Sequence, residues 1–195
     1  MQQTKLIVIP KRSEESASCP RHTRSCPKSL DGLSSWTRFY TGLVSDGTKT
    51  NELLLREVTT HSPEETIALG RTLAELLTPP KFVLLRGDLG AGKTTLVKGI
   101  AAAFEAAAEE EVTSPTFTLV HEYRGAGATI YHIDLYRIDT QRELDTLALD
   151  DLRSENSILL IEWGEKFPRF VRERDVEIAL ERKAESERKI TVSGR

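Results

Sequence analysis

The eight residues from Gly87 to Thr94, GDLGAGKT, fit the pattern G-x-x-x-x-G-K-[ST], in which a loop holds nucleotide phosphates. Its glycines, which include Gly90 and Gly92, allow the backbone to curl so that N–H groups converge on phosphate oxygens. A helix that begins near Lys93 directs the positive end of its dipole at the same point. We expect Lys93 to reach the β and γ phosphates and the Thr94 hydroxyl to bind Mg²⁺.

Two carboxylates follow apolar runs further along the chain. Asp134 ends the run in YHIDLY, and Glu162 ends the run in ILLIEW. Enzymes with a phosphate loop use an acid at the end of a neighbouring strand, near the Mg²⁺ ion. Either residue suits that role, one on the metal directly and the other through water.

A polar segment, VTSPTFTLVHEY, lies between the phosphate loop and these acids. Its hydroxyls and the turn at Pro115 suit a loop that senses the γ-phosphate. A polar loop that simply enters a strand is nearly as good an interpretation. His121 and His132 are assigned no chemical role, because a lone histidine on a strand is more often a packed residue.

The elements expected to position these residues alternate between strand and helix. HSPEETIALGRTLAELLTPP predicts a helix with Ser62 as its N-cap, Pro63 at its first position and Glu65 closing a capping box. Alternation of this kind predicts an α/β domain, like that of the phosphate-loop NTPases, with a mainly parallel central sheet flanked by helices and a C-terminal β-hairpin. Strands are expected at 53–60, 81–87, 116–125, 128–138 and 157–163, helices at 61–80, 93–111 and 141–152, and the hairpin at 175–194.

The charge divides the 195 residues into two parts. Residues 1–50 carry eight Lys or Arg and four Asp or Glu, whereas residues 51–195 carry 19 and 26. The first part has no sustained apolar period, which predicts a disordered N-terminal extension before a domain at 51–195. A transit peptide and a misplaced start codon are alternatives for this extension. An acidic domain is a poor stand-alone binder of nucleic acid.

Three candidate zinc ligands, Cys19, His22 and Cys26, lie in the N-terminal part. Their spacing is unlike common zinc modules and a fourth ligand is missing, so we favour a tail without metal. No apolar run approaches the roughly 18 residues that span a membrane, and we expect a soluble, cytoplasmic protein.

Four motifs in order, GDLGAGKTTL, SPTFTLVHEY, YHIDLYR and LLIEW, closely resemble the TsaE (formerly YjeE) family over about Val58 to Val192. These are bacterial ATPases needed for threonylcarbamoyl-adenosine modification of tRNA. The resemblance implies a small phosphate-loop fold, weak ATP hydrolysis with Mg²⁺, and association with TsaB and TsaD, through which tRNA is reached indirectly.

The resemblance also implies roles for individual residues. Thr94 and Glu162 match the family's Mg²⁺ ligands, and Asp134 matches its Walker-B-like acid. Lys93, Asp134 and Glu162 are therefore the expected catalytic residues. Nucleotide contacts are expected from Pro63, Leu89, Gly90, Ala91, Gly92, Lys93, Thr94 and Arg188.

Two other functions fit the phosphate loop alone. A small-molecule kinase would need an acceptor pocket and usually a basic lid, for which no Arg-rich segment is evident, although Arg137 and Arg142 are available. A nucleotide-gated binding module would bind ATP with negligible turnover. We favour an ATP-hydrolysing accessory factor of tRNA modification.

Overall fold

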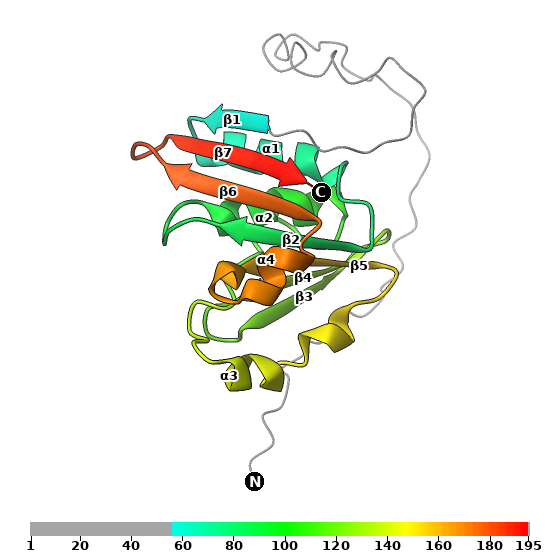
Figure 1. The fold of residues 1–195 in the computed structure, drawn as a ribbon. Helices are drawn as coiled ribbons and strands as arrows, with labels where there is room; N and C mark the ends of the chain where they lie inside the picture. The colour runs from blue at the N-terminus through cyan, green and yellow to red at the C-terminus, as the bar shows by residue number, and fades with distance from the viewer. Residues whose placement is uncertain (1–55, 195) are drawn as a thin grey trace, which may run out of the picture. The chain divides into compact units, whose positions relative to one another are not determined.

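The computed structural model describes residues 56–194. The predictions made for residues 1–50, including the tail and its candidate zinc ligands, lie outside the described residues. The described strands form one seven-stranded sheet in the order β1-β7-β6-β2-β5-β4-β3 (Figure 1). The strands are β1 Arg56–Thr60, β2 Lys81–Arg86, β3 Val120–Arg124, β4 Thr129–Asp134, β5 Ser157–Glu162, β6 Val176–Arg182 and β7 Arg188–Gly194.

The four central strands, β6, β2, β5 and β4, are parallel. The outer strands β7, β1 and β3 each pair antiparallel with their neighbours, and β6 and β7 form the C-terminal hairpin. The predicted α/β class, mainly parallel sheet and terminal hairpin are confirmed.

Helices cover both faces of the sheet. The helices are α1 Pro63–Ala74, α2 Lys93–Ala103, α3 Gln141–Thr146 and α4 Pro168–Glu173. Side chains from α1 and α2 share one apolar core with alternate residues of the central strands, such as Val83 and Leu85. Residues of α3 and α4 share a second core with the opposite face, including Phe82. Within 56–194, no helix is long and apolar enough to cross a membrane.

The first helix begins as the sequence predicts, with one difference in its cap. The Ser62 side chain accepts from the Glu65 N–H at 3.1 Å, and Pro63 occupies the first turn. The Glu65 carboxylate accepts from the N–H of His61 at 2.7 Å, one residue before the N-cap, and so does not close a regular capping box.

Helix α2 is shorter than the predicted 93–111, because it ends in a Schellman motif after Ala103. The N–H of Glu105 donates to Ala102 O, the N–H of Ala106 donates to Ala101 O, and Glu105 adopts a positive φ of 53°. Glycine usually holds this left-handed position, so a sequence with glutamate there gave no sign of a helix end.

Other boundaries also differ from the predictions. The strand predicted from residue 116 begins at Val120, because 116–118 form a turn and the next residue, Leu119, has a φ of 67°. The helix predicted over 141–152 breaks at Ala148, which has a φ of 47°, and continues as a 3-10 helix over Leu149–Leu152. A 3-10 helix at Gly164–Lys166 and the whole of α4 were not predicted.

Candidate functional site

Three parallel strands end at the same edge of the sheet, and their ends supply the polar groups of a cavity. The phosphate-loop sequence follows β2, Asp134 ends β4 and Glu162 ends β5. The carboxyl edge of a parallel sheet is where α/β proteins place their ligands. The cavity has a volume of about 320 Å³ and is lined by Ser62, Pro63, Thr66, Leu89, Gly90, Gly92, Lys93, Thr94, Thr95, Ser114, Thr116, Asp134, Tyr136, Glu162, Trp163, Ser186 and Arg188.

The phosphate-loop sequence turns directly into α2. Gly92 is the N-cap of this helix with a φ of 104°, a left-handed conformation that suits glycine, and no side chain caps the helix. The first regular backbone bond runs from Leu96 N to Gly92 O. The amides of the first turn therefore face the cavity end of the helix without a side-chain acceptor, an arrangement that favours anions.

Lys93 folds back over this loop. Its Nζ atom donates to Gly87 O at 2.7 Å and to Asp88 O at 3.1 Å. It also lies 3.6 Å from Glu162 Oε2 and 4.7 Å from the centroid of the Trp163 ring. The lysine side chain is only 4% exposed, so water screens its charge little and the charge acts strongly on groups beside the loop.

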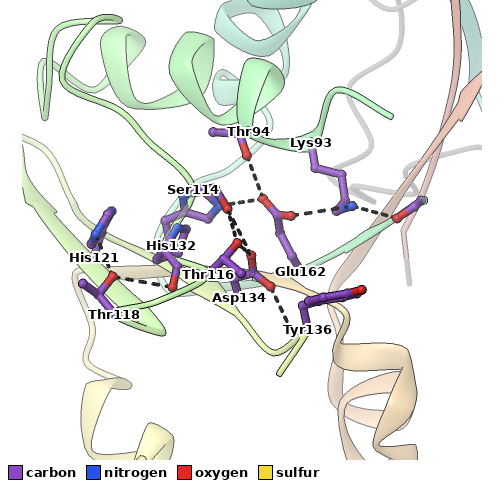
Figure 2. Close-up of polar contacts among 12 residues, drawn as sticks. Lys93, Thr94, Ser114, Thr116, Thr118, His121, His132, Asp134, Tyr136 and Glu162 are labelled. Carbon is purple, nitrogen blue, oxygen red and sulfur yellow. Dashed lines mark hydrogen bonds and ion pairs between the residues drawn. The ribbon is translucent and has the colours of Figure 1, made fainter. Parts of the chain in front are cut away.

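Glu162 lies at the centre of the polar cluster (Figure 2). Its Oε1 atom accepts from Thr94 Oγ1 at 3.3 Å and is 2.8 Å from His132 Nε2. Because its side chain is 5% exposed, these donors and Lys93 replace the water that a free carboxylate would bind. The structure thus brings the two predicted metal ligands, Thr94 and Glu162, into direct contact.

Asp134 organises the polar segment that precedes β3. Its Oδ2 atom accepts from Ser114 Oγ at 3.0 Å and from Thr116 Oγ1 at 2.6 Å, and its Oδ1 accepts from Tyr136 N at 2.9 Å. The hydroxyls therefore bind a strand-end carboxylate beside the cavity, a contact that favours the interpretation of this segment as part of the site.

The structure gathers the predicted site residues around one cavity. Pro63, Leu89, Gly90, Gly92, Lys93, Thr94, Asp134, Glu162 and Arg188 all line it. Ala91 does not: it is 1% exposed, and its N–H donates to Asp88 O within the loop. Arg188 reaches the phosphate loop from β7, and a Cβ built on Gly92 would lie 3.6 Å from its Nε atom.

Several lining residues were not singled out as site residues in the sequence. Thr95 follows the matched motif directly, and Tyr136 lies two residues after Asp134, so both could have been predicted from their sequence neighbours. Ser186 lies in the β6–β7 connection, where nothing in the sequence marks a site. Ser62 and Thr66 were part of the predicted helix and were given no further role.

His121 stays outside the cavity. Its ring contacts Thr118 Oγ1 at 2.8 Å and the Tyr123 hydroxyl at 3.1 Å. Burial, and then the nearby imidazole of His132, lowers the pKa of His121 below its ordinary value. These contacts explain the residue without a catalytic role.

Comparisons with known proteins agree with the resemblance seen in the motifs. The family model described as threonylcarbamoyl adenosine biosynthesis protein TsaE matches residues 60–190. The tRNA threonylcarbamoyladenosine biosynthesis protein TsaE of Haemophilus influenzae is 40% identical over 129 residues, which cover 63% of this chain and 80% of that protein. The Mycobacterium tuberculosis protein of the same name is 38% identical over 172 residues, or 83% of this chain and 95% of that one.

A solved structure is also similar. The crystal structure of Bacillus subtilis YdiB matches with a TM-score of 0.57 and 32% sequence identity, covering 72% of this chain and 85% of that one.

Proposed function

Because the chain belongs to the TsaE family of tRNA threonylcarbamoyladenosine biosynthesis, we propose that it binds ATP with Mg²⁺, hydrolyses it slowly, and thereby drives the tRNA-modifying complex of TsaB and TsaD type proteins. The observation that carries this proposal is the meeting of Lys93, Thr94 and Glu162 in one cavity at the open end of α2. A triphosphate is the ligand whose charge this arrangement suits.

The donors present fit a magnesium ion. Thr94 Oγ1 lies 3.3 Å from Glu162 Oε1, so a hydroxyl and a carboxylate adjoin the place where phosphates are proposed to bind. Magnesium typically takes one or two carboxylates together with phosphate oxygens and water, all of them hard oxygen ligands. Thr94 and Glu162 would hold the ion, and it would supply positive charge against the charge that develops during hydrolysis.

We assign different tasks to the two acids. Glu162 adjoins Thr94 and Lys93, and it is the acid proposed to hold the metal. Asp134 holds the hydroxyls of Ser114 and Thr116, and it is proposed to couple that segment to the nucleotide, on the metal only through water.

The nucleoside is proposed to bind against lining residues from α1 and the C-terminal hairpin. Ser62 and Pro63 line the cavity from the start of α1, and Ser186 and Arg188 line it from the hairpin of β6 and β7. Arg188 also adjoins Gly92, so a nucleotide held by the phosphate loop would lie within reach of the hairpin.

The energy of hydrolysis is proposed to reset the TsaB–TsaD complex between rounds of modification in the cytoplasm. Residues 51–195 carry 26 acidic against 19 basic residues, which disfavours direct binding to a phosphate backbone. The tRNA is then contacted through the partners.

The test is Glu162→Gln, which keeps the shape of the side chain and removes its charge. ATP affinity without Mg²⁺ is expected to change little, whereas hydrolysis should fall about 100-fold or more, on the scale of losing one preorganised electrostatic group. ATP affinity, phosphate release and modified adenosine per complex are measured on one preparation. The matched control is Glu155→Gln, which removes the same charge from an exposed position outside the cavity lining.

Normal hydrolysis by Glu162→Gln would move the metal role to Asp134. Lost hydrolysis with undiminished multiple-turnover modification would reject the coupling of ATP energy to the partner cycle, and ATP binding alone would then be the switch.

A further inference from the structure

The carboxylate of Glu162 is held by two hydrogen-bonding side chains and one ammonium group, which come from two elements. Thr94 and Lys93 approach it from the first turn of α2, and His132 approaches it from β4 (Figure 2). The donors are divided between its two oxygens. Oε1 has Thr94 at 3.3 Å and His132 at 2.8 Å, whereas the one partner of Oε2 in the described part of the chain is the Nζ atom of Lys93 at 3.6 Å.

Two of these groups are proposed to contact the nucleotide and its metal when ATP binds. This inference rests on the proposed function. Lys93 is proposed to turn to the phosphates and Thr94 to the metal. Thr94 then gives up its hydrogen bond to Glu162, and Lys93 gives up its ion pair with the same carboxylate. The orientation of Glu162 in the nucleotide-bound protein therefore depends on the remaining donor, His132.

His132 has no second hydrogen-bond partner within residues 56–194. It is fully buried in β4, where it pairs with His121 of β3 and with Leu160 of β5. Glu162 lies two residues beyond Leu160, so the imidazole and the carboxylate share one face of the sheet as diagonal neighbours. The ring is consequently fixed by the strand register and cannot follow Lys93 or Thr94.

Packing alone does not account for an imidazole in this place. The Nδ1 atom of His132 is buried and has no hydrogen-bond partner among the described residues. A buried polar atom without a partner costs free energy that an apolar side chain of similar size would avoid. The compensating contact is the one between Nε2 and Glu162, which suggests that this contact has a use.

We propose that His132 is a positioning residue for the metal site: its Nε2–H holds Oε1 of Glu162 in place and leaves Oε2 to bind the magnesium ion of the nucleotide. A carboxylate only accepts hydrogen bonds, so the proton of this bond belongs to Nε2. Carboxylates that bind metals are commonly oriented by a second hydrogen bond of this kind, and its loss typically costs about 10- to 100-fold in metal affinity or activity.

The experiment compares His132→Phe with His132→Gln in the full chain. Phenylalanine fills the space without a donor, whereas the glutamine amide reaches about as far as Nε2 and donates again. Calorimetry measures ATP affinity in Mg²⁺ and in a chelator. The magnesium contribution is the affinity in Mg²⁺ divided by the affinity in chelator. For His132→Phe we expect this ratio to fall about 10-fold while the affinity in chelator stays within about twofold, with kcat reduced more than KM changes. His132→Gln should recover most of the ratio.

Three results would overturn the proposal: an unchanged magnesium contribution in folded His132→Phe, an equal loss with and without Mg²⁺, or a glutamine variant no better than phenylalanine. If His132→Phe does not fold, His132→Asn takes its place, because its shorter amide falls short of Glu162; equal ratios for Asn and Gln would then overturn the proposal.

Glu162→Gln, measured in parallel, separates this inference from the proposed function. A full magnesium contribution in that variant would remove Glu162 from the metal and contradict the proposed site itself. If the magnesium contribution is reduced in Glu162→Gln but unchanged in His132→Phe, the positioning role of His132 alone is contradicted.

Discussion

The Lys93 side chain is held beside the cavity by partners that a bound anion would replace. Its ammonium group is buried, and its partners are two loop carbonyls and the carboxylate of Glu162. A buried charge without partners is strongly unfavourable, so these contacts hold the side chain beside the cavity until another anion competes for it. Phosphate oxygens carry more charge than carbonyl groups and are the expected competitor.

Lys93→Ala tests this role at the residue scale. Removing the charge is expected to weaken ATP binding at least tenfold, about 1.4 kcal/mol, as measured by calorimetry. Lys98→Ala is the matched control, because it removes the same charge from the same helix outside the cavity lining. Unchanged affinity in a folded Lys93→Ala protein would contradict the phosphate-loop assignment.

At the scale of elements, α1 and α2 cross in close backbone contact. A Cβ built on Gly99 of α2 would lie 2.0 Å from Ile67 O and 2.9 Å from Arg71 N, both backbone atoms of α1. Only glycine allows the helices to approach this closely. The contact matters for the site because both helices begin at the cavity. Ser62 and Pro63 line it at the start of α1, and α2 follows the phosphate loop directly.

Gly99→Ala is therefore expected to destabilise the protein although alanine favours helices. Overpacking of this kind costs about 1–3 kcal/mol, and denaturant unfolding measures it. ATP affinity should also fall, since α1 must shift. Gly127→Ala, with nothing within 4 Å of its new Cβ, should be nearly neutral. Equal stability of the two variants would show that α1 moves aside freely.

At the scale of the whole molecule, the domain is expected to fold without residues 1–50. Both faces of the sheet are covered by apolar cores formed within residues 56–194. We expect a chain that begins at Asn51 to melt within a few degrees of the full chain and to bind ATP equally well. A large loss of stability or of binding in a thermal melt and a titration would contradict the assignment of 1–50 as a separate extension.

Two exposed apolar side chains belong to segments that line the cavity. Phe117 is 85% exposed and Leu89 is 76% exposed; Leu89 lines the cavity, and Phe117 follows Thr116, which does too. Exposed large apolar groups that gather beside a site mark interaction surfaces. We therefore predict that Leu89 and Phe117 contact the partner complex of the proposed function.

Phe117→Ser is expected to weaken binding to the TsaB–TsaD type complex about tenfold while leaving ATP affinity unchanged. A pull-down titration in the presence of ATP measures the first quantity and calorimetry the second. Undiminished partner binding would place the partner surface elsewhere on the domain.

The sequence by itself determined those parts of the protein that depend on near neighbours. The phosphate-loop motif is contiguous, so its glycines, lysine and threonine can be recognised without knowledge of the fold. The acids at the ends of apolar runs were recognisable because parallel strands all end at one edge. The sheet class followed from the alternation of helices and strands. By contrast, the end of α2 was hidden, because Glu105 takes a conformation that its residue type rarely signals.

Only the tertiary structure decided which distant residues meet. His132 and Glu162 lie 30 residues apart, and they touch because β4 and β5 pair in one register; a slip of one residue would turn the imidazole to the opposite face. Arg188 reaches the phosphate loop because β6 pairs with β2 and the hairpin then returns along β6. Contacts of this kind depend on strand order and register, which are properties of the assembled sheet and not of any local stretch of the chain.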